Sequence, residues 1–187
     1  MAEQRYYMAC LDLTGRSCLV VGGGTVGLEK TRGLLECGAQ VTVVAPKVVP
    51  ELLDLPVEWL EGHYASWDLG GKWLAIAATP DRGVNRRVKA DAERLGIFCN
   101  VGDDPELCSL ILPAVHRVEP IAIAVSTGGA SPALAQHLRT EIAAIVGPEH
   151  AQLARRLRAL RPWAREHLET YEERRSYFER LVSEALR

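Results

Sequence analysis

The sequence predicts an α/β fold in which a parallel sheet comes first and a β-hairpin and several helices follow it. Three observations support this prediction. The N-terminal part alternates short apolar, β-branched runs with amphipathic segments, which is the pattern that the strands and helices of a parallel sheet produce. Two more β-type runs flank a Glu-Pro pair, and the C-terminal part repeats apolar residues at helical spacing. With 187 residues, the chain can hold one domain of ordinary size and a smaller one.

The regular structure is expected to begin with a strand, a glycine-rich turn and a helix. Residues 16–21 form an apolar run that ends in three glycines, and residues 26–35 then place apolar side chains at helical spacing. Residues 40–45 form a β-branched run that Pro46 stops. Together these segments predict a βαβ unit with a right-handed crossover.

The same pattern continues until about residue 113. A continuous apolar run, such as residues 73–78, is typical of a strand that is buried on both faces of a parallel sheet. Gly96 is expected to end a helix at residues 81–95. Three strands and one helix are therefore expected, at residues 57–60, 73–78 and 97–100 and at residues 81–95. We expect the first domain to cover residues 1–113.

A β-hairpin is predicted next, from two β-type runs at residues 114–118 and 121–126. A hairpin alone is barely stable. We therefore expect residues 114–147, which hold the hairpin and a helix at 132–146, to form a dimerisation region. Ser131 and Pro132 suit the N-cap and first turn of that helix.

The last segment, residues 148–187, is predicted to be a small helical domain. Its apolar positions recur at helical spacing between charged residues, and Pro162 is expected to begin a second helix there. The arginines of this segment suit solvated helix faces with acidic partners at i,i+4, or the binding of a polyanionic substrate.

Composition excludes several classes of protein. The formal net charge is −2, with 48% hydrophobic and 25% charged residues, which is typical of a globular protein. No basic cluster is present outside the helical tail, so nucleic-acid binding is not expected. No apolar run approaches the ~18 residues that cross a bilayer, so no membrane association is expected. The five cysteines form an odd set without a CxxC pair, which favours reduced thiols in the cytoplasm.

The turn after the first strand carries the motif Gly22-x-Gly24-x-x-Gly27. Between a strand and a helix, this spacing is the fingerprint of a Rossmann-type dinucleotide site, where helix N–H groups hold the pyrophosphate. The alternative is a glycine-rich turn that only connects packed elements. The acidic residue expected after the second strand is replaced by Pro46 and Lys47, so the motif alone does not separate NAD from NADP.

Two further loops are candidate site segments. Residues 100–105 follow the fifth strand, at the sheet edge where ligands bind, and a carboxylate there can accept a proton during a dehydrogenation. A solvated turn or a helix cap is the alternative. Residues 126–132 combine hydroxyls and glycines before a helix, which suits anion binding by backbone N–H groups or, alternatively, an ordinary connection with a serine N-cap.

Metal and nucleophile motifs are not found in the sequence. The five histidines are isolated, without HExxH or a CxxC partner, so no resident metal site is expected. No GxSxG elbow is present either.

In order and spacing, five segments resemble the precorrin-2 dehydrogenase family, the dehydrogenase and chelatase module of siroheme synthase. They are LDLTGR at residues 11–16, VVGGGTVG at 20–27, WLAIAAT at 73–79, FCNVGD at 98–103 and STGGASPALA at 126–135. The resemblance is close over about residues 5–145 and loose in the helical tail. Gly27 stands where many members have alanine, and Gly102 stands where a β-branched residue would be stiffer.

The resemblance implies an NAD-dependent oxidoreductase that converts precorrin-2, a tetrapyrrole, to sirohydrochlorin in siroheme or cobalamin biosynthesis. It also implies a homodimer and, in some members, a ferrochelatase that inserts Fe²⁺, with Co²⁺ as another possible metal substrate. The methyltransferase domain fused in some siroheme synthases is not expected. The predicted roles are catalysis by Asp103; cofactor binding by Gly22, Gly24, Thr25, Val26, Pro46, Lys47 and Thr79; and substrate binding by Asn100, Ser126, Thr127, Gly128 and Gly129.

A rival from another class is a regulatory module that binds NAD without catalysis, since a Rossmann domain with a helical tail also describes such proteins. It would bind the dinucleotide and leave precorrin-2 unchanged.

Overall fold

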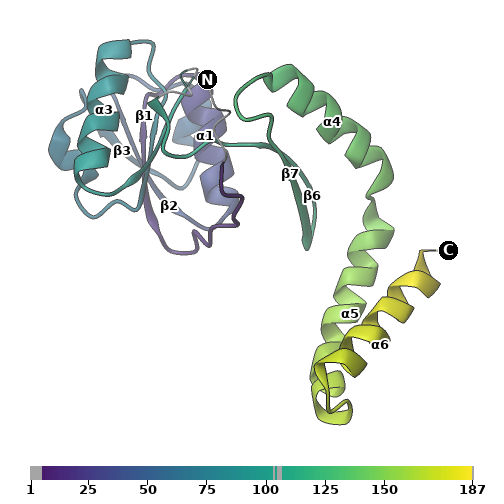
Figure 1. The fold of residues 1–187 in the computed structure, drawn as a ribbon. Helices are drawn as coiled ribbons and strands as arrows, with labels where there is room; N and C mark the ends of the chain where they lie inside the picture. Colours follow the sequence, from purple (N-terminus) through teal and green to yellow (C-terminus); the bar gives the residue numbers. More distant parts are fainter. Residues whose placement is uncertain (1–5, 103, 105–106, 187) are drawn as a thin grey trace. The chain divides into compact units, whose positions relative to one another are not determined.

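The computed structural model describes residues 6–102, 104 and 107–186. The chain forms two compact units, residues 1–112 and residues 113–187. Figure 1 draws the elements of both units. A further division of the second unit near residue 148 stays a prediction.

The first unit is the predicted parallel sheet with its helices. Its strands lie in the order β3-β2-β1-β4-β5, and every neighbouring pair is parallel. The elements are β1 (Ser17–Val21), α1 (Thr25–Glu36), β2 (Gln40–Ala45), α2 (Pro50–Leu53), β3 (Glu58–Glu61), the 3₁₀ helix η1 (Ser66–Leu69), β4 (Leu74–Ala77), α3 (Arg82–Arg94) and β5 (Phe98–Val101). The sequence pattern did not predict α2 or η1.

The sheet is buried on both faces, as the continuous apolar runs predicted. Side chains alternate along β1, so that Val20 packs in one cluster with Leu28 of α1, and Val21 in another with Val88 of α3. Both valines of β1 are almost fully buried. The strand order changes direction between β1 and β4, which is where open α/β sheets bind their ligands.

The second unit consists of a hairpin and three helices. It comprises β6 (Ala114–Val118), β7 (Ile121–Val125), α4 (Pro132–Ile145), α5 (Pro148–His167) and α6 (Tyr171–Ala185). The hairpin is antiparallel, and α4 packs against both of its strands. The Nε2 atom of His116 lies 2.8 Å from the Val146 carbonyl oxygen, which ties β6 to the end of α4.

The prediction that Pro162 begins a helix is wrong, because Pro162 lies inside α5. The next residue, Trp163, stacks on His167 and packs against Tyr177 of α6, and these contacts favour a continuous α5 across the missing N–H group. The following helix begins instead after Thr170, whose hydroxyl accepts a hydrogen bond from the Glu173 N–H at 3.1 Å.

Candidate functional site

The carboxyl-terminal ends of β1, β2, β4 and β5 meet at one edge of the sheet, and backbone hydrogen bonds hold the segments that follow them. The Gly22 N–H donates to the Val44 carbonyl oxygen at 2.9 Å, and the Ala78 N–H donates to that of Val21 at 2.8 Å. The Gly102 N–H donates to Ala77 at 2.9 Å. The predicted residues of the first unit that lie in these segments are therefore brought to the same edge.

Two glycines of the motif allow main chain to pack against main chain. Gly22 has a φ of +123°, and a Cβ atom there would collide with the carbonyl group of Ala78 in the neighbouring turn. A Cβ atom on Gly27 would collide with the Gly22 carbonyl oxygen. Side chains larger than hydrogen would thus force the turn away from β4 and away from α1.

Gly23 is a site residue that the motif spacing missed. A Cβ atom at this position would collide with the carbonyl oxygen of Lys47, and the Gly23 carbonyl oxygen accepts a hydrogen bond from the Val49 N–H at 2.8 Å. This contact joins the turn after β1 to the segment after β2, which holds Pro46 and Lys47. The available signal was the run of three glycines, of which the motif uses only two.

Gly24 differs from its neighbours because nothing lies within 4 Å of a Cβ atom built on it. It is the N-cap of α1, with no side-chain cap and no acidic residue in the first turn. The first helical hydrogen bond runs from the Leu28 N–H to the Gly24 carbonyl oxygen at 2.9 Å. The N–H groups of Thr25 and Val26, which precede it in the first turn, therefore belong to a helix N-terminus that no side chain fills.

Thr79 lies directly after β4 and is held by α3. Its hydroxyl lies 2.8 Å from the Asn85 Oδ1 atom and 3.0 Å from the Asp81 carbonyl oxygen. The Asn85 amide donates in return to the Thr79 carbonyl oxygen at 2.9 Å, and Asn85 is buried. Asn85 is thus a positioning residue for this turn that the sequence reasoning missed.

Pro46 and Lys47 follow β2 and are both exposed. No ion pair involves Lys47 within the described part of the chain. An exposed cation beside the glycine turn suits an anionic ligand, but it does not select among ligands.

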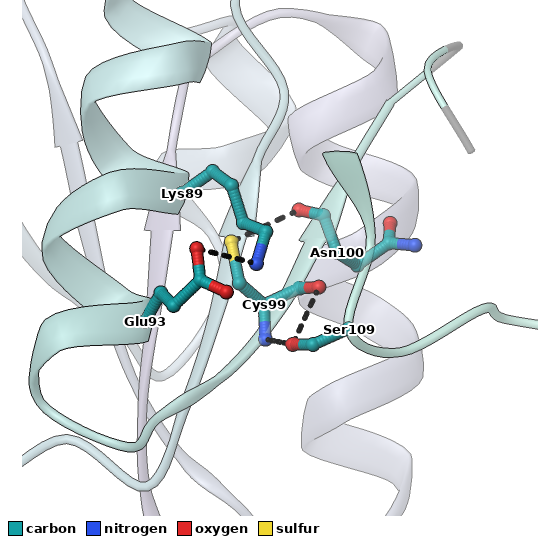
Figure 2. Close-up of polar contacts among 5 residues, drawn as sticks. All are labelled: Lys89, Glu93, Cys99, Asn100 and Ser109. Atoms are coloured by element: carbon teal, nitrogen blue, oxygen red, sulfur yellow. Dashed lines mark hydrogen bonds and ion pairs between the residues drawn. The ribbon is translucent and has the colours of Figure 1, made fainter. Parts of the chain in front are cut away.

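Asn100 is buried in β5, and its amide nitrogen contacts its own chain. It donates to the Leu110 carbonyl oxygen at 2.9 Å and lies 3.5 Å from the Cys108 sulfur. On the other side of the strand, Cys99 faces Lys89 and Glu93 of α3 (Figure 2). The Cys99 N–H donates to the Ser109 hydroxyl at 2.8 Å. These bonds hold residues 109 and 110 against β5.

Asp103, the predicted catalytic residue, lies outside the described residues. It follows Gly102 in the chain, so its neighbour in the sequence is held at the sheet edge by Ala77. The cysteines nearby are poor nucleophiles: burial raises the pKa of Cys99 to about 11 and raises that of Cys108 above its usual value. Both thiols therefore stay protonated at neutral pH.

The predicted substrate residues of the second unit form a hydrogen-bonded loop before α4. The Thr127 hydroxyl donates to the Ser131 carbonyl oxygen and accepts from the Ser131 N–H, each at 3.1 Å. The Ser126 hydroxyl accepts from the Gly128 N–H at 3.2 Å, and Gly129 follows it. Ser131 caps α4 as predicted, because its hydroxyl accepts from the Leu134 N–H at 3.2 Å.

The described residues contain neither a cluster of metal ligands nor a membrane-spanning helix. Within those ranges, no three His, Cys, Asp or Glu side chains group together so that they could hold a metal ion. Likewise, none of the described helices is both long and apolar enough to span a membrane.

The order of the strands, the glycine turn and the uncapped helix define a Rossmann-type dinucleotide-binding domain. The chain belongs to the putative NAD(P)-binding family, whose model matches residues 9–114. A second model, described as the sirohaem biosynthesis protein central region, matches residues 119–145.

Individual proteins are similar over most of the chain. It is 41% identical to siroheme synthase 3 of Aeromonas hydrophila and 40% identical to siroheme synthase of Chromobacterium violaceum, over 91% and 95% of its length. The chain spans only 37% and 38% of those relatives. The solved structure of SirC, a precorrin-2 dehydrogenase, matches 95% of this chain and 89% of its own, with a TM-score of 0.76 and 25% identity.

Proposed function

We propose that this chain is an NAD⁺-dependent dehydrogenase that oxidises precorrin-2 to sirohydrochlorin. The observation that carries the proposal is the open N-terminus of α1 behind Gly24, in a fold that matches SirC over nearly its whole length. A regulatory NAD-binding module would also have an open helix N-terminus. It would not explain why the match to SirC extends over the second unit as well.

The residues present at the sheet edge fit a dinucleotide. Gly24 gives a pyrophosphate access to the main chain, and the N–H groups of the first turn of α1 can donate to it. Thr25 and Val26 carry those N–H groups, while Pro46 and Lys47 follow β2, where a ribose binds in this fold. Thr79 closes the opposite side after β4. These assignments explain why α1 has no cap of its own.

The reaction removes one hydride and one proton from the macrocycle and yields NADH. When NAD⁺ is bound, it supplies the hydride acceptor. We assign the proton to the carboxylate of Asp103, which follows β5 in the sequence, because open parallel sheets bind their ligands beyond the carboxyl ends of their strands. Burial keeps the neighbouring thiols protonated, so they do not compete for this role.

The substrate carries several carboxylates, and the loop at residues 126–129 offers N–H and hydroxyl groups for them. The Thr127 and Ser126 hydroxyls are already ordered by hydrogen bonds within the loop. Asn100 is expected to act mainly by positioning, because its amide nitrogen holds the segment after β5.

The decisive experiment compares two neighbouring carboxylates. In an anaerobic assay with precorrin-2 and NAD⁺, Asp103→Asn is expected to lower kcat by about 10²- to 10⁴-fold, the range typical of general acid–base catalysis. Asp104→Asn is the matched control and should keep nearly full activity. Calorimetry should give the same NAD⁺ affinity for both variants and the unsubstituted protein.

Two outcomes would contradict the proposal. Full activity of Asp103→Asn would remove this carboxylate from the mechanism. NAD⁺ binding without any oxidation of precorrin-2 by the unsubstituted protein would favour the regulatory module.

A homodimer is part of the proposal. Within the described chain, β6 and β7 form a sheet of only two strands, so each strand has an edge without a strand partner. The face opposite α4 carries Arg117 together with the small apolar side chains of Val115, Ala122 and Ala124, and the apolar part of this face suits a second copy of the hairpin. Analytical ultracentrifugation that shows only monomer at micromolar concentration would overturn this part.

Insertion of Fe²⁺ or Co²⁺ into sirohydrochlorin stays a prediction, since the described residues offer no resident metal site. Either metal would be a substrate. Incubation of the protein with sirohydrochlorin and each ion, beside a control without enzyme, tests it. A cytoplasmic location also stays a prediction, supported by five free cysteines.

A further inference from the structure

A pocket lies between α5 and α6, wholly within the second unit. Its volume is about 790 Å³, within the range of small-molecule sites. It is lined by arginines and by apolar or aromatic side chains, with a single carboxylate among them. The lining residues are Arg161, Ala164, Arg165, Tyr171, Arg174, Arg175, Phe178, Glu179, Val182 and Ser183.

Two of the four arginines have partners in the chain. The Arg175 Nε donates to the Glu179 carboxylate at 2.7 Å, which neutralises the only acid of the pocket. Arg174 donates to the carbonyl oxygens of Leu168 and Glu169 at 2.6 and 2.9 Å. Arg174 thereby closes the turn between α5 and α6, and its role there is structural.

The other two, Arg161 and Arg165, differ from these. Both are exposed, and no hydrogen bond or ion pair involves either guanidinium within the described ranges. They stand one helical turn apart on α5, so their Cβ atoms are about 6 Å from each other. Two guanidiniums at this spacing can each bind a carboxylate of one ligand.

Apart from Ser183, the rest of the wall is apolar or aromatic. Phe178 and Val182 of α6 and Ala164 of α5 line the pocket, and Tyr171 adds a second aromatic ring. Ala164 is buried, which brings the two helices close together. The pocket therefore offers an apolar surface to a flat ring and two cations to the carboxylates on that ring.

We propose that this pocket is a second tetrapyrrole site, which binds the carboxylated macrocycle outside the dehydrogenase site. The choice of ligand rests on the proposed function, because only that reaction supplies a flat molecule with several carboxylates. Arg161 and Arg165 bind two of the carboxylates, and Phe178 packs against the ring. Such a site would keep a second molecule of substrate or product bound to the protein.

The test is a titration of the whole 187-residue chain, saturated with NAD⁺, with uroporphyrin, an octacarboxylate porphyrin. We expect two porphyrins per chain, one for each site. The double variant Arg161→Ala/Arg165→Ala is expected to bind one, while its NAD⁺ affinity stays unchanged. The matched control is Arg156→Ala/Arg158→Ala, which removes the same charge from α5 outside the pocket and should still bind two.

Several results would overturn the site. A stoichiometry of one for the unsubstituted protein, or equal loss in both double variants, would reduce the pocket to a charged surface. Displacement of the porphyrin by equimolar citrate or pyrophosphate would show that it binds small anions without regard to shape. Oxidation of precorrin-2 is measured separately. If the pocket binds no porphyrin but precorrin-2 is oxidised, the proposed function stands and the second site is rejected. If two porphyrins bind but precorrin-2 is not oxidised, the second site stands and the proposed function is rejected.

Discussion

The helices α1 and α3 follow neighbouring strands of one sheet, yet their N-termini are capped differently. The carboxylate of Asp81 caps α3 and accepts hydrogen bonds from the Gly83 and Val84 N–H groups at 2.7 and 3.2 Å. Gly24 caps α1 without any side chain, and its surroundings are empty. The fold thus fills the N-terminus of α3 with its own carboxylate and leaves the N-terminus of α1 open.

A helix N-terminus is open to a ligand anion only where no side chain of the protein already binds its N–H groups. Every helix begins with N–H groups that lack an intrahelical partner and with a partial positive charge. At α3 those groups stabilise the protein. At α1 no side chain binds these N–H groups, so they add no such stability. The close main-chain packing of Gly22 and Gly27 keeps this open helix N-terminus in position.

The largest expected effect comes from removing that packing. Gly22→Ala places a Cβ atom against the Ala78 carbonyl group at a positive φ, so we expect unfolding to require about 3 kcal/mol less free energy. Urea denaturation measures the loss, and calorimetry should detect no NAD⁺ binding. Gly15→Ala is the control, because Gly15 also has a positive φ, +68°, but no atom within 4 Å of its Cβ position. Equal losses in both variants would show that close packing is not what constrains Gly22.

The next effect comes from giving α1 the cap that α3 has. Gly24→Asp should leave stability unchanged or slightly raised, because the space is empty and the backbone, at φ −85° and ψ −171°, is extended as an N-cap requires. NAD⁺ affinity should fall at least about tenfold, since the carboxylate takes the N–H groups and repels the pyrophosphate. Gly24→Asn is matched in size without the charge and should lose less. Undiminished affinity in Gly24→Asp would mean that the cofactor binds elsewhere.

The elements of the sheet could be predicted from the sequence because their signals are local. A β-branched run stopped by Pro46, or a short apolar run such as residues 73–78, predicts a strand from its own length, composition and flanking residues. The glycine motif was found for the same reason, and its place at the edge of the sheet followed from the parallel topology.

The remaining features depend on contacts between distant segments. The collision partners of Gly23 come from the segment after β2, and the amide of Asn100 binds Leu110, so neither role shows in the local sequence. Pro162 looked like a helix start because the local pattern does not show the contact between Trp163 and Tyr177 of α6 that supports a continuous α5. The local sequence pattern therefore gave a wrong or incomplete prediction where contacts between distant segments determine the structure.

The smallest effect is the reciprocal change at α3. Asp81→Ala removes the cap and should lower the free energy of unfolding by about 1 kcal/mol, as N-cap losses typically do. The Tm, from thermal denaturation followed by circular dichroism, should fall by a few degrees, and NAD⁺ affinity should change far less than in Gly24→Asp. The control Asp54→Ala removes a charge from the end of α2, where no N-terminus is capped, and should have little effect. If Asp81→Ala weakened NAD⁺ binding as strongly as Gly24→Asp, the two helix ends would share one ligand and the contrast between them would fail.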